Sequence, residues 1–462
     1  MALTNEAQIQ DDRADEYANG PVPEADKTVG AMSIFSVMLG ITTALIWFSL
    51  GSQLVHSFGT MNFVIGATAT AIIVGIISFV WVNFASKSGF NSDLITRASG
   101  FGYLGSTLTA LIFATNNLLY FGLEGGIMIN AVHAYFPAIP LLLLQVMCGL
   151  IFIPLTCFGV KLVSRIMWLS LPVLFLFFVL IAWKAIEMGG TPDFWALQAS
   201  PDMNSAAGSP ILQVMVAMFG ISGIAATASD FGRFIPSKNA KSGGIMMGPV
   251  FTLFTFLVPL LFGAWLGATF EENDPAVYFT HFFGAFGVLL IVITQARINT
   301  NNVYSAAVSL ATFFNRLFHI NLSRFWWVVI ASVMCVLILT ADLYSKATLV
   351  LGVWGIFLIT WVGVVFADIL INRYILKLTP SDYFYRKDQL RSFNPVGIIA
   401  LFTALIVALP LSFGIAGPFG STIAPFVAFA ITLIVTPLVA LITKGQFSTK
   451  QSQVHYATDS AQ

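Results

Sequence analysis

The sequence contains little charge: Asp, Glu, Lys and Arg make up only 9% of its 462 residues, and their formal charges cancel to zero. Soluble globular chains carry about 25% charged residues, so this composition excludes that class. The zero net charge also argues against nucleic acid as a partner, because a nucleic-acid-binding surface needs an excess of Lys and Arg.

Cysteine and histidine are scarce as well, with three Cys and five His residues. Cys148, Cys157 and Cys335 lie in apolar segments and lack the spacing of a metal site or an exported disulfide framework. The histidines are scattered along the chain. We therefore expect a structural role for the cysteines, no metal site and no cofactor.

Hydrophobic residues, in contrast, make up 57% of the chain, and its mean hydropathy is +0.87. A membrane-spanning helix needs about 20 consecutive apolar residues, and the chain holds about twelve such segments. The sequence thus predicts an all-α polytopic membrane protein. The segments begin near Ala31, Phe63, Tyr103, Ile139, Ile166, Pro210, Gly244, Phe282, Trp326, Thr348, Pro395 and Ser421.

The membrane domain is expected to occupy residues 29–446. A disordered acidic tail is predicted at residues 1–28, which lack the apolar core of a signal peptide, and a second tail at residues 447–462. Most Lys and Arg residues fall in the loops on one side of the membrane, and the positive-inside rule places these loops and both termini in the cytoplasm. This pattern predicts a multi-pass protein of the inner or plasma membrane.

Two charged residues lie deep inside apolar segments. Arg297 sits near the middle of residues 282–314, surrounded by Gln295, Asn299 and Asn302, and Glu124 is equally deep in the third segment. A charge at the centre of a bilayer costs about 2.5 kcal/mol or more, so such residues usually face the bundle interior or a substrate pathway. We expect both side chains to have a partner or a function.

A faint internal repeat links the first and sixth segments. Val37–Thr43 (VMLGITT) resembles Ala217–Gly223 (AMFGISG), and the two segments cross the membrane in opposite directions. In secondary transporters, such glycine-interrupted helices in two inverted halves break near the midplane, where their free backbone groups bind substrate or ion. Close helix packing is the alternative role for these glycines.

Short patterns in the later segments occur in a characteristic order. They are Arg97–Gly102 (RASGFG), Tyr120–Glu124 (YFGLE), Ser229–Phe234 (SDFGRF), Asn299–Ser305 (NTNNVYS) and Ala367–Asp368. Together, over about residues 32–444, they resemble the nucleobase:cation symporter family, which includes purine, cytosine, allantoin and hydantoin permeases.

This resemblance implies a LeuT-type fold that works by alternating access around a central site. Two inverted five-helix repeats, at about 31–187 and 210–373, would precede two extra helices at about 395–444. It also implies a planar nitrogen heterocycle as substrate, held between aromatic residues of the third and sixth helices and bound by amides of the third and eighth.

Carried over by motif, Tyr120 is the aromatic residue of the third helix, with Asn117 and Glu124 as its polar companions. These three lie at i−3, i and i+4 and share one helix face. Helix-to-helix hydrogen bonding is the alternative role for Tyr120 and Asn117. On the eighth helix, Asn299 and Asn302 are the amides implied by the resemblance.

The sixth helix departs from the family pattern, because Ile221 stands where the second stacking aromatic is expected. Phe219 could take its place only if the unwound segment turns that ring inward. Gly220 and Gly223 still permit the break, and their backbone groups could bond the edge of a heterocycle. We therefore include all four residues in the predicted substrate site.

Glu124 replaces a neutral amide of the best-known family pattern and admits three interpretations. As an ionised acceptor it suits a donor-rich edge, such as that of cytosine or guanine, or a guanidinium-like group. A buried carboxyl can instead carry the coupled proton. The third interpretation is a structural salt bridge to Arg297.

The resemblance also bears on Arg297. Sodium-coupled family members hold the ion between carbonyls of the broken first helix, here near Gly40 and Thr43, and two hydroxyl residues of the eighth helix. This chain has Ala296-Arg297-Ile298 in that stretch. A fixed guanidinium can donate hydrogen bonds to the same carbonyls. We therefore predict sodium-independent transport, with proton coupling or exchange as the remaining modes.

The expected activity is uptake of a nucleobase or a related small nitrogen heterocycle by a secondary transporter, with a monomer as the default state. A membrane enzyme would need a catalytic constellation, and a channel would need repeated polar rings; neither is visible. The alternatives within the transporter class are a guanidino-compound, amino-acid or quaternary-amine carrier of the same fold, and a sodium-coupled symporter.

Overall fold

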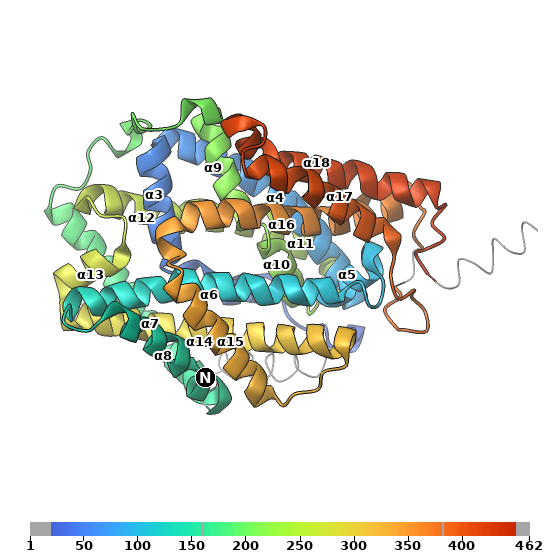
Figure 1. Cartoon of the computed structure of the whole chain (residues 1–462), viewed down its shortest axis with the longest axis horizontal. Helices are drawn as coiled ribbons and strands as arrows, with labels where there is room; N and C mark the ends of the chain where they lie inside the picture. The colour runs from blue at the N-terminus through green and yellow to red at the C-terminus, as the bar shows by residue number, and fades with distance from the viewer. Residues whose placement is uncertain (1–19, 159, 381–382, 450–462) are drawn as a thin grey trace, which may run out of the picture.

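The computed structural model describes residues 20–158, 160–380 and 383–449, and in this part of the chain every regular element is helical. The long helices lie side by side along the long axis of the molecule, with α5 near one end and α13 near the other (Figure 1). We call these the Asp93 end and the Asp274 end, after an acidic residue at each. The core lies between the helices, in a few large apolar clusters.

The expected transmembrane segments coincide with single helices or with interrupted ones. In the first half the elements are α2 (Ala31–Met38), η2 (Leu39–Thr43), α3 (Ile46–Phe58), α4 (Thr60–Ser88), α5 (Ser92–Thr96), η3 (Arg97–Phe101), α6 (Thr107–Tyr135), α7 (Leu141–Phe158) and α8 (Val160–Glu187).

The second half repeats this pattern and is followed by two further helices. Its elements are α9 (Pro210–Phe219), α10 (Ile224–Gly232), α11 (Ala240–Ile245), η7 (Met246–Val250), α12 (Phe251–Phe270), α13 (Pro275–Phe283), α14 (Ala285–Phe318), α15 (Arg324–Thr340), α16 (Ala347–Ala367), η9 (Asp368–Ile375), α17 (Pro395–Ser412) and α18 (Gly417–Ile442). Short 3₁₀ turns occur at η1 (Glu24–Asp26), η4 (Phe194–Ala196), η5 (Ser205–Ala207), η6 (Ser237–Asn239) and η8 (Tyr344–Lys346).

Local sequence signals account for several helix ends. The side chain of Asn91 accepts a hydrogen bond from the backbone of Leu94 and so caps α5. Asp274 and Asn394 cap α13 and α17 in the same way, and each is followed by proline. Proline suits the first helical position because the N–H that it lacks would have no partner there.

Both members of the internal repeat lie at helix breaks, as predicted. The first is the 3₁₀ segment Leu39–Thr43, between α2 and α3. The second lies between α9 and α10, which are bent by 45°. At Gly220 an added Cβ would lie 2.7 Å from the carbonyl oxygen of Leu351 on α16. Glycine therefore allows the close approach of α16 at this break.

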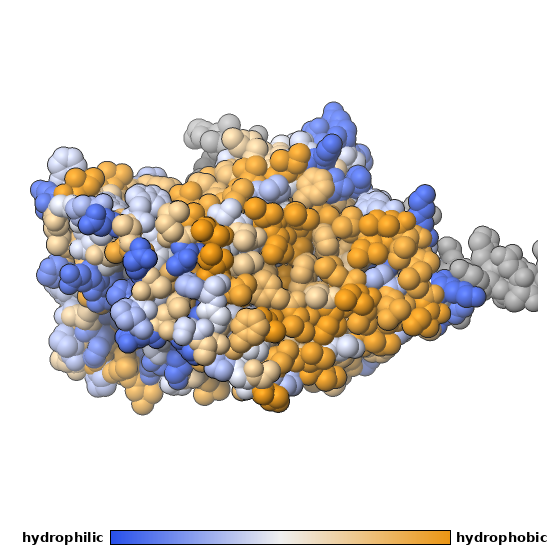
Figure 2. All heavy atoms as spheres, turned by 90° about the horizontal axis from the view of Figure 1, so that it is seen from above, coloured by the Kyte–Doolittle hydropathy of each residue, from blue (hydrophilic) through white to orange (hydrophobic). Residues whose placement is uncertain are grey.

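Five helical stretches are long and apolar enough to cross a membrane, and the bent pair α9–α10 makes a sixth. The five are Thr60–Ser88, Ser237–Phe270, Tyr344–Ile375, Pro395–Ser412 and Gly417–Ile442. The long helices α6 and α14 are not among them, and these helices carry Glu124 and Arg297. Figure 2 shows a wide, continuous hydrophobic surface on one face of the molecule. Such a surface suits contact with lipid, because soluble proteins rarely expose large apolar patches.

The expected disordered tail is wrong for residues 20–28, which fold against the Asp93 end; residues 1–19 lie outside the described residues. The Lys27 ammonium donates to the carbonyl of Ser86 at 2.7 Å, at the end of α4, where helix carbonyls lack partners. Glu24 accepts hydrogen bonds from the Ser237 hydroxyl and backbone. The Ser237 hydroxyl and the Lys27 ammonium lower the pKa of Glu24 to about 2, so it remains ionised at neutral pH.

Candidate functional site

A group of buried polar residues lies where α6 and α14 meet the two broken helices. Glu124 is 1% exposed, Arg297 4% and Gln295 0%. α6 and α14 pack along each other over much of their length. Because burial of polar groups costs free energy unless they find partners, their partners indicate what the group does.

Arg297 is bonded directly to the first break. Its Nη2 donates to Thr43 Oγ1 at 2.6 Å, and that hydroxyl donates to the carbonyl oxygen of Gly40 at 2.7 Å. The Thr43 hydroxyl thus accepts from the guanidinium and passes a hydrogen bond to the unwound backbone. A charge-assisted bond of this kind is among the stronger hydrogen bonds in proteins. The arginine therefore brings a fixed positive charge from the eighth helix to the broken first helix.

Glu124 has no comparable partner. Its Oε2 is buried without a hydrogen bond. The carboxyl lies close to the Gln295 side chain and the Ile46 backbone N–H, and within electrostatic range of Arg297. Glu124 and Arg297 do not form a salt bridge, although both lie in the described part of the chain. The structural interpretation of Glu124 as an ion-pair partner is therefore wrong, and a carboxyl oxygen is left available.

Amide side chains line one face of α14. Gln295, Asn299 and Asn302 are spaced i, i+4 and i+7, which places them on the same side of the helix. Asn302 Nδ2 donates to Asn299 Oδ1 at 3.1 Å. Both amide atoms of Gln295 and the Nδ2 of Asn299 are buried without partners. Two donors and one acceptor are therefore free for a ligand.

Tyr120 lies between the two broken helices. Its hydroxyl donates to the carbonyl oxygen of Gly220 at 3.4 Å, at the second break. Its ring centroid is 6.2 Å from that of Trp47, which lies just after the first break, and the rings are tilted by 60°. The Tyr120 ring is partly buried against the same apolar cluster that contains Ile221.

Phe219 does not reach this place, so the expectation that it could replace the missing aromatic is wrong. Its ring packs edge-on against Phe426 of α18, with centroids 5.2 Å apart. It belongs to an apolar cluster with Trp354 and Leu358, separate from the cluster of Ile221. Residues at the start of the break turn with the backbone, and this turn points Phe219 toward α16 and α18.

Asn117 lies beside the site on α6, where its Nδ2 donates to the carbonyl of Phe113 in its own helix at 2.7 Å. Gly223 follows the second break, with Leu358 of α16 against it. Sequence reasoning missed Trp47 and Gln295 as site residues. The i, i+4, i+7 spacing of the α14 amides could have revealed Gln295, whereas no local signal marks Trp47.

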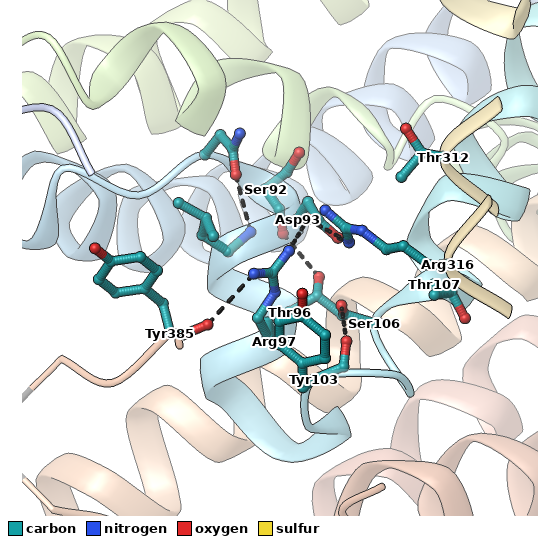
Figure 3. A network of polar contacts seen from close by, with 12 residues as sticks. Ser92, Asp93, Thr96, Arg97, Tyr103, Ser106, Thr107, Thr312, Arg316 and Tyr385 are labelled. Carbon is teal, nitrogen blue, oxygen red and sulfur yellow. Dashed lines mark hydrogen bonds and ion pairs between the residues drawn. The ribbon is translucent and has the colours of Figure 1, made fainter. Parts of the chain in front are cut away.

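A second polar network lies at the Asp93 end, where Figure 3 shows Asp93 between two arginines. Asp93 Oδ2 accepts from Arg97 Nη2 at 2.7 Å and from Arg316 Nη1 at 2.9 Å. The neighbouring Ser92 donates through its backbone N–H to Asp230 on α10 at 2.7 Å. α5 therefore joins the end of α14 to the helix that follows the second break.

Replacing Asp93 with asparagine is expected to reduce stability by about 2 kcal/mol, because it leaves two largely buried guanidinium groups without a counter-charge. The check is the thermal unfolding midpoint in detergent, which should fall. The matched control is Glu187→Gln, which removes the exposed ion pair with Lys184 and should leave the midpoint unchanged. Equal effects of the two substitutions would contradict this prediction.

Metal chemistry finds no support in the described residues, where no three His, Cys, Asp or Glu side chains are placed to hold an ion. The features that stand out are two broken helices in opposite halves and a buried polar group between them. This arrangement is typical of secondary transporters.

Comparison with known proteins agrees with this geometry. Residues 21–442 match the model of a family described as permeases for cytosine/purines, uracil, thiamine and allantoin. The chain belongs to this permease family. It is a multi-pass membrane transporter and not an enzyme. None of the curated protein sequences matches the chain significantly.

Solved structures show the same fold. An inward-facing structure of Mhp1 superposes with a TM-score of 0.74 at 16% identity, covering 94% of this permease and 96% of Mhp1. A closed structure of Mhp1, described as a nucleobase-cation-symport-1 family transporter with bromovinylhydantoin bound, gives 0.63 at 18% identity, covering 92% and 95%. A Na⁺-coupled sialic acid symporter gives 0.58 at 15% identity, covering 93% and 92%. These likenesses confirm the LeuT-type fold of the permease.

Proposed function

We propose that this permease imports a nucleobase or a related small nitrogen heterocycle, and that protons rather than sodium drive the uptake. The observation that carries the proposal is the contact of Arg297 with Thr43. It places a permanent cation at the broken first helix, and the family membership supplies the substrate class.

The substrate site is proposed to lie between Tyr120 and the amide face of α14. The Tyr120 ring offers a surface for stacking, which is worth about 1–3 kcal/mol per base. The free donors and acceptor of Gln295 and Asn299 suit the mixed polar edge of a heterocycle. Asn117, Asn302, Ile221 and the backbone at Gly220 and Gly223 complete this proposed site.

Glu124 is proposed to carry the coupled proton. The Glu124 carboxyl has one unpartnered oxygen and lies beside Gln295, so it touches the same group that would hold the substrate. A proton on Glu124 turns this oxygen from an acceptor into a donor. Substrate binding and protonation can therefore influence each other through a shared amide.

Sodium is disfavoured by the charge of Arg297. The Thr43 hydroxyl already accepts a hydrogen bond from the guanidinium, and the Gly40 carbonyl accepts one from the Thr43 hydroxyl, so both oxygen atoms at the first break are engaged. An arginine stays protonated at any physiological pH and cannot leave the site. A sodium ion beside it would meet a like charge.

The Asp93 end is proposed to face the cytoplasm, with both chain termini on that side of the inner or plasma membrane. Lys87, Arg97 and Arg316 lie at that end, and the positive-inside rule places such residues in the cytoplasm. The Asp274 end then faces outward. A monomer is the proposed state.

The experiment that tests the substrate class is competition for uptake in proteoliposomes. Labelled cytosine, adenine, uracil, allantoin and hydantoin are supplied singly, and unlabelled amino acids, betaine and small guanidino compounds serve as competitors. Saturable uptake of one heterocycle that amino acids and betaine do not inhibit would support the proposal. Uptake of only amino acids or quaternary amines would contradict it.

A guanidino compound is the second candidate, because the free oxygen of Glu124 is an acceptor well suited to a donor-rich cation. The same competition experiment tests this candidate. It predicts that a guanidino compound is itself transported and that it abolishes the uptake of heterocycles.

Tyr120→Ala is expected to raise KM for uptake about tenfold or more, because it removes the stacking surface. Tyr120→Phe keeps the ring and should change KM little. The matched control is Tyr135→Ala, at the exposed end of the same helix. Initial rates over a range of substrate concentrations provide the measurement, and an unchanged KM in Tyr120→Ala would place the substrate elsewhere.

A further inference from the structure

A half-buried carboxylate outside the membrane-spanning helices connects several elements at the Asp274 end. Asp274 Oδ1 accepts from the Ala276 backbone at 2.8 Å and so caps α13, and its Oδ2 accepts from Asn130 of α6 at 2.7 Å. The Tyr344 hydroxyl of η8 also interacts with this carboxylate. That hydroxyl donates to Ser49 on α3 at 3.0 Å. One acidic group thus helps to hold α13, α6, η8 and α3 together.

These contacts lie next to the proposed site. Ser49 follows Trp47 by two positions, and Trp47 contacts Tyr120. A further bond joins Ser52 of α3 to Asn273, the residue before Asp274, at 2.6 Å. α3 cannot move away from α6 and α13 at this end unless the contacts around Asp274 break.

Solution can reach the partners of this carboxylate. A cavity of about 430 Å³ lies between α6, α7 and the turn that joins α15 to η8, and Asn130 and Tyr344 form part of its wall. Asp342 and Ser345, on the same wall, are exposed. The cavity is large enough for many water molecules. Asp274 is itself only half-buried, so its carboxyl can exchange a proton with the solution.

Among the described residues, the groups that act on the Asp274 carboxyl are neutral or negatively charged. Its own loop contributes Glu272, whose Oε1 accepts the Asp274 backbone N–H at 2.9 Å. α13 contributes Tyr278, η8 contributes Tyr344, and α6 contributes the amide of Asn130. Burial raises the pKa of Asp274, and the negative charge of Glu272 adds to the rise, while the hydrogen bonds from Asn130, Ala276 and Tyr344 oppose it.

We propose that Asp274 is a second proton-binding residue of the transport cycle. Its protonated form is proposed to favour the arrangement described above, in which contacts around Asp274 join α3, α6 and α13; we call this the closed arrangement of the Asp274 end. A proton on the Asp274 carboxyl can be donated to the Tyr344 oxygen, while the Tyr344 hydroxyl donates to Ser49. Asn130 still donates to Oδ2 in this state. Every hydrogen bond of the closed arrangement is therefore compatible with a neutral carboxyl.

The direction of the pH effect follows from linkage. When this end opens, the carboxyl returns to water and to its ordinary pKa, so the closed form binds the proton more tightly than the open form. Lower pH therefore favours closure and higher pH favours opening, by about tenfold in the equilibrium for each pKa unit between the two forms. If the Asp274 end faces outward, as proposed above, an acidic exterior closes the path behind the substrate.

Hydrogen–deuterium exchange of the full chain in lipid nanodiscs, without substrate or ion gradient, tests this proposal. Wild type is compared with Asp274→Asn at about pH 5.5 and at about pH 8. Asparagine keeps the cap of α13 and is permanently neutral. Because the two proteins are compared at the same pH, the dependence of the chemical exchange rate on pH cancels. Residues 46–58 and 275–283 report on the contacts around Asp274.

The expected result is slower exchange of both segments in Asp274→Asn at the higher pH, by up to about tenfold per pKa unit, and a smaller difference at the lower pH. The control is Asp202→Asn, which changes an acid with an exposed side chain in another loop of the proposed outer side. Its exchange rates should match those of wild type at both pH values. No difference at the higher pH, or the same difference at both, would overturn the proposal and leave Asp274 as a helix cap only.

A measurement on the wild-type chain keeps the proposal testable if Asp274→Asn does not fold. After correction for intrinsic exchange rates, residues 275–283 should be less protected at the higher pH than at the lower pH. The protection of α17 should be the same at both. Equal changes in both would overturn the proposal. Because this experiment uses no substrate, it remains valid if the proposed substrate or coupling ion is wrong.

Discussion

Arg297→Ala reduces uptake by about a hundredfold if the guanidinium stands in for a coupling cation, since the loss of a buried charged hydrogen-bond partner costs about 3 kcal/mol. The Thr43 hydroxyl loses its donor, and the Gly40 carbonyl behind it loses its link to the eighth helix. The break between α2 and α3 is then no longer linked to α14 through this residue. Uptake of the labelled heterocycle in proteoliposomes, at equal amounts of reconstituted protein, measures the loss.

Two further variants separate a charge effect from a simple packing effect. Arg297→Lys keeps the charge but lacks the planar fork of donors, so intermediate uptake is expected. Arg297→Ser removes the charge and introduces a hydroxyl, and sodium should stimulate this variant more than wild type. Arg324→Ala, at the exposed start of α15, serves as the matched control. Wild-type uptake by Arg297→Ala would mean that the guanidinium has no part in transport.

Glu124→Gln should abolish accumulation driven by a proton gradient while leaving substrate exchange across the membrane intact. Glutamine has nearly the same shape and can still contact Gln295, but it cannot gain or lose a proton. The expected result is equilibration of substrate to equal concentrations on both sides, with no response to an imposed pH difference. Counterflow of labelled against unlabelled substrate measures the exchange that remains.

The control for this variant is Glu271→Gln, which changes an exposed acid at the start of the loop before α13. It should accumulate substrate as wild type does. Continued accumulation by Glu124→Gln would move the coupled proton to another group, and Asp274 would be the next acid to test. Loss of exchange as well as accumulation would instead indicate a direct role of Glu124 in substrate binding.

Much of the architecture could be predicted from the sequence because hydrophobicity and glycine placement determine it locally. The similar motifs around Gly40 and Gly220 correctly located both helix breaks. Glycine has no side chain to fill the gap at a break, and a bilayer tolerates free backbone groups only where protein surrounds them. These constraints act within one segment, so they are visible without knowledge of the fold.

The details of the site depend on contacts between distant segments, and these could not be predicted. Trp47 meets Tyr120 only because α3 and α6 pack together, and Phe219 meets Phe426 because α9 packs against α18. The ordered segment at Lys27 depends on carbonyl groups at the end of α4, sixty positions away in the chain. A polar, acidic composition indicated disorder there, and the tertiary contact overrode it.

The measurement that tests the central proposal most directly is initial uptake of the transported heterocycle into proteoliposomes under four conditions. They combine an inward proton gradient or none with an inward sodium gradient or none, at a clamped membrane potential. We expect the proton gradient to stimulate uptake and the sodium gradient to have no effect, because Arg297 is proposed to take the place of the cation. Strict dependence on sodium, with no response to protons, would contradict this account and would leave Arg297 a structural residue.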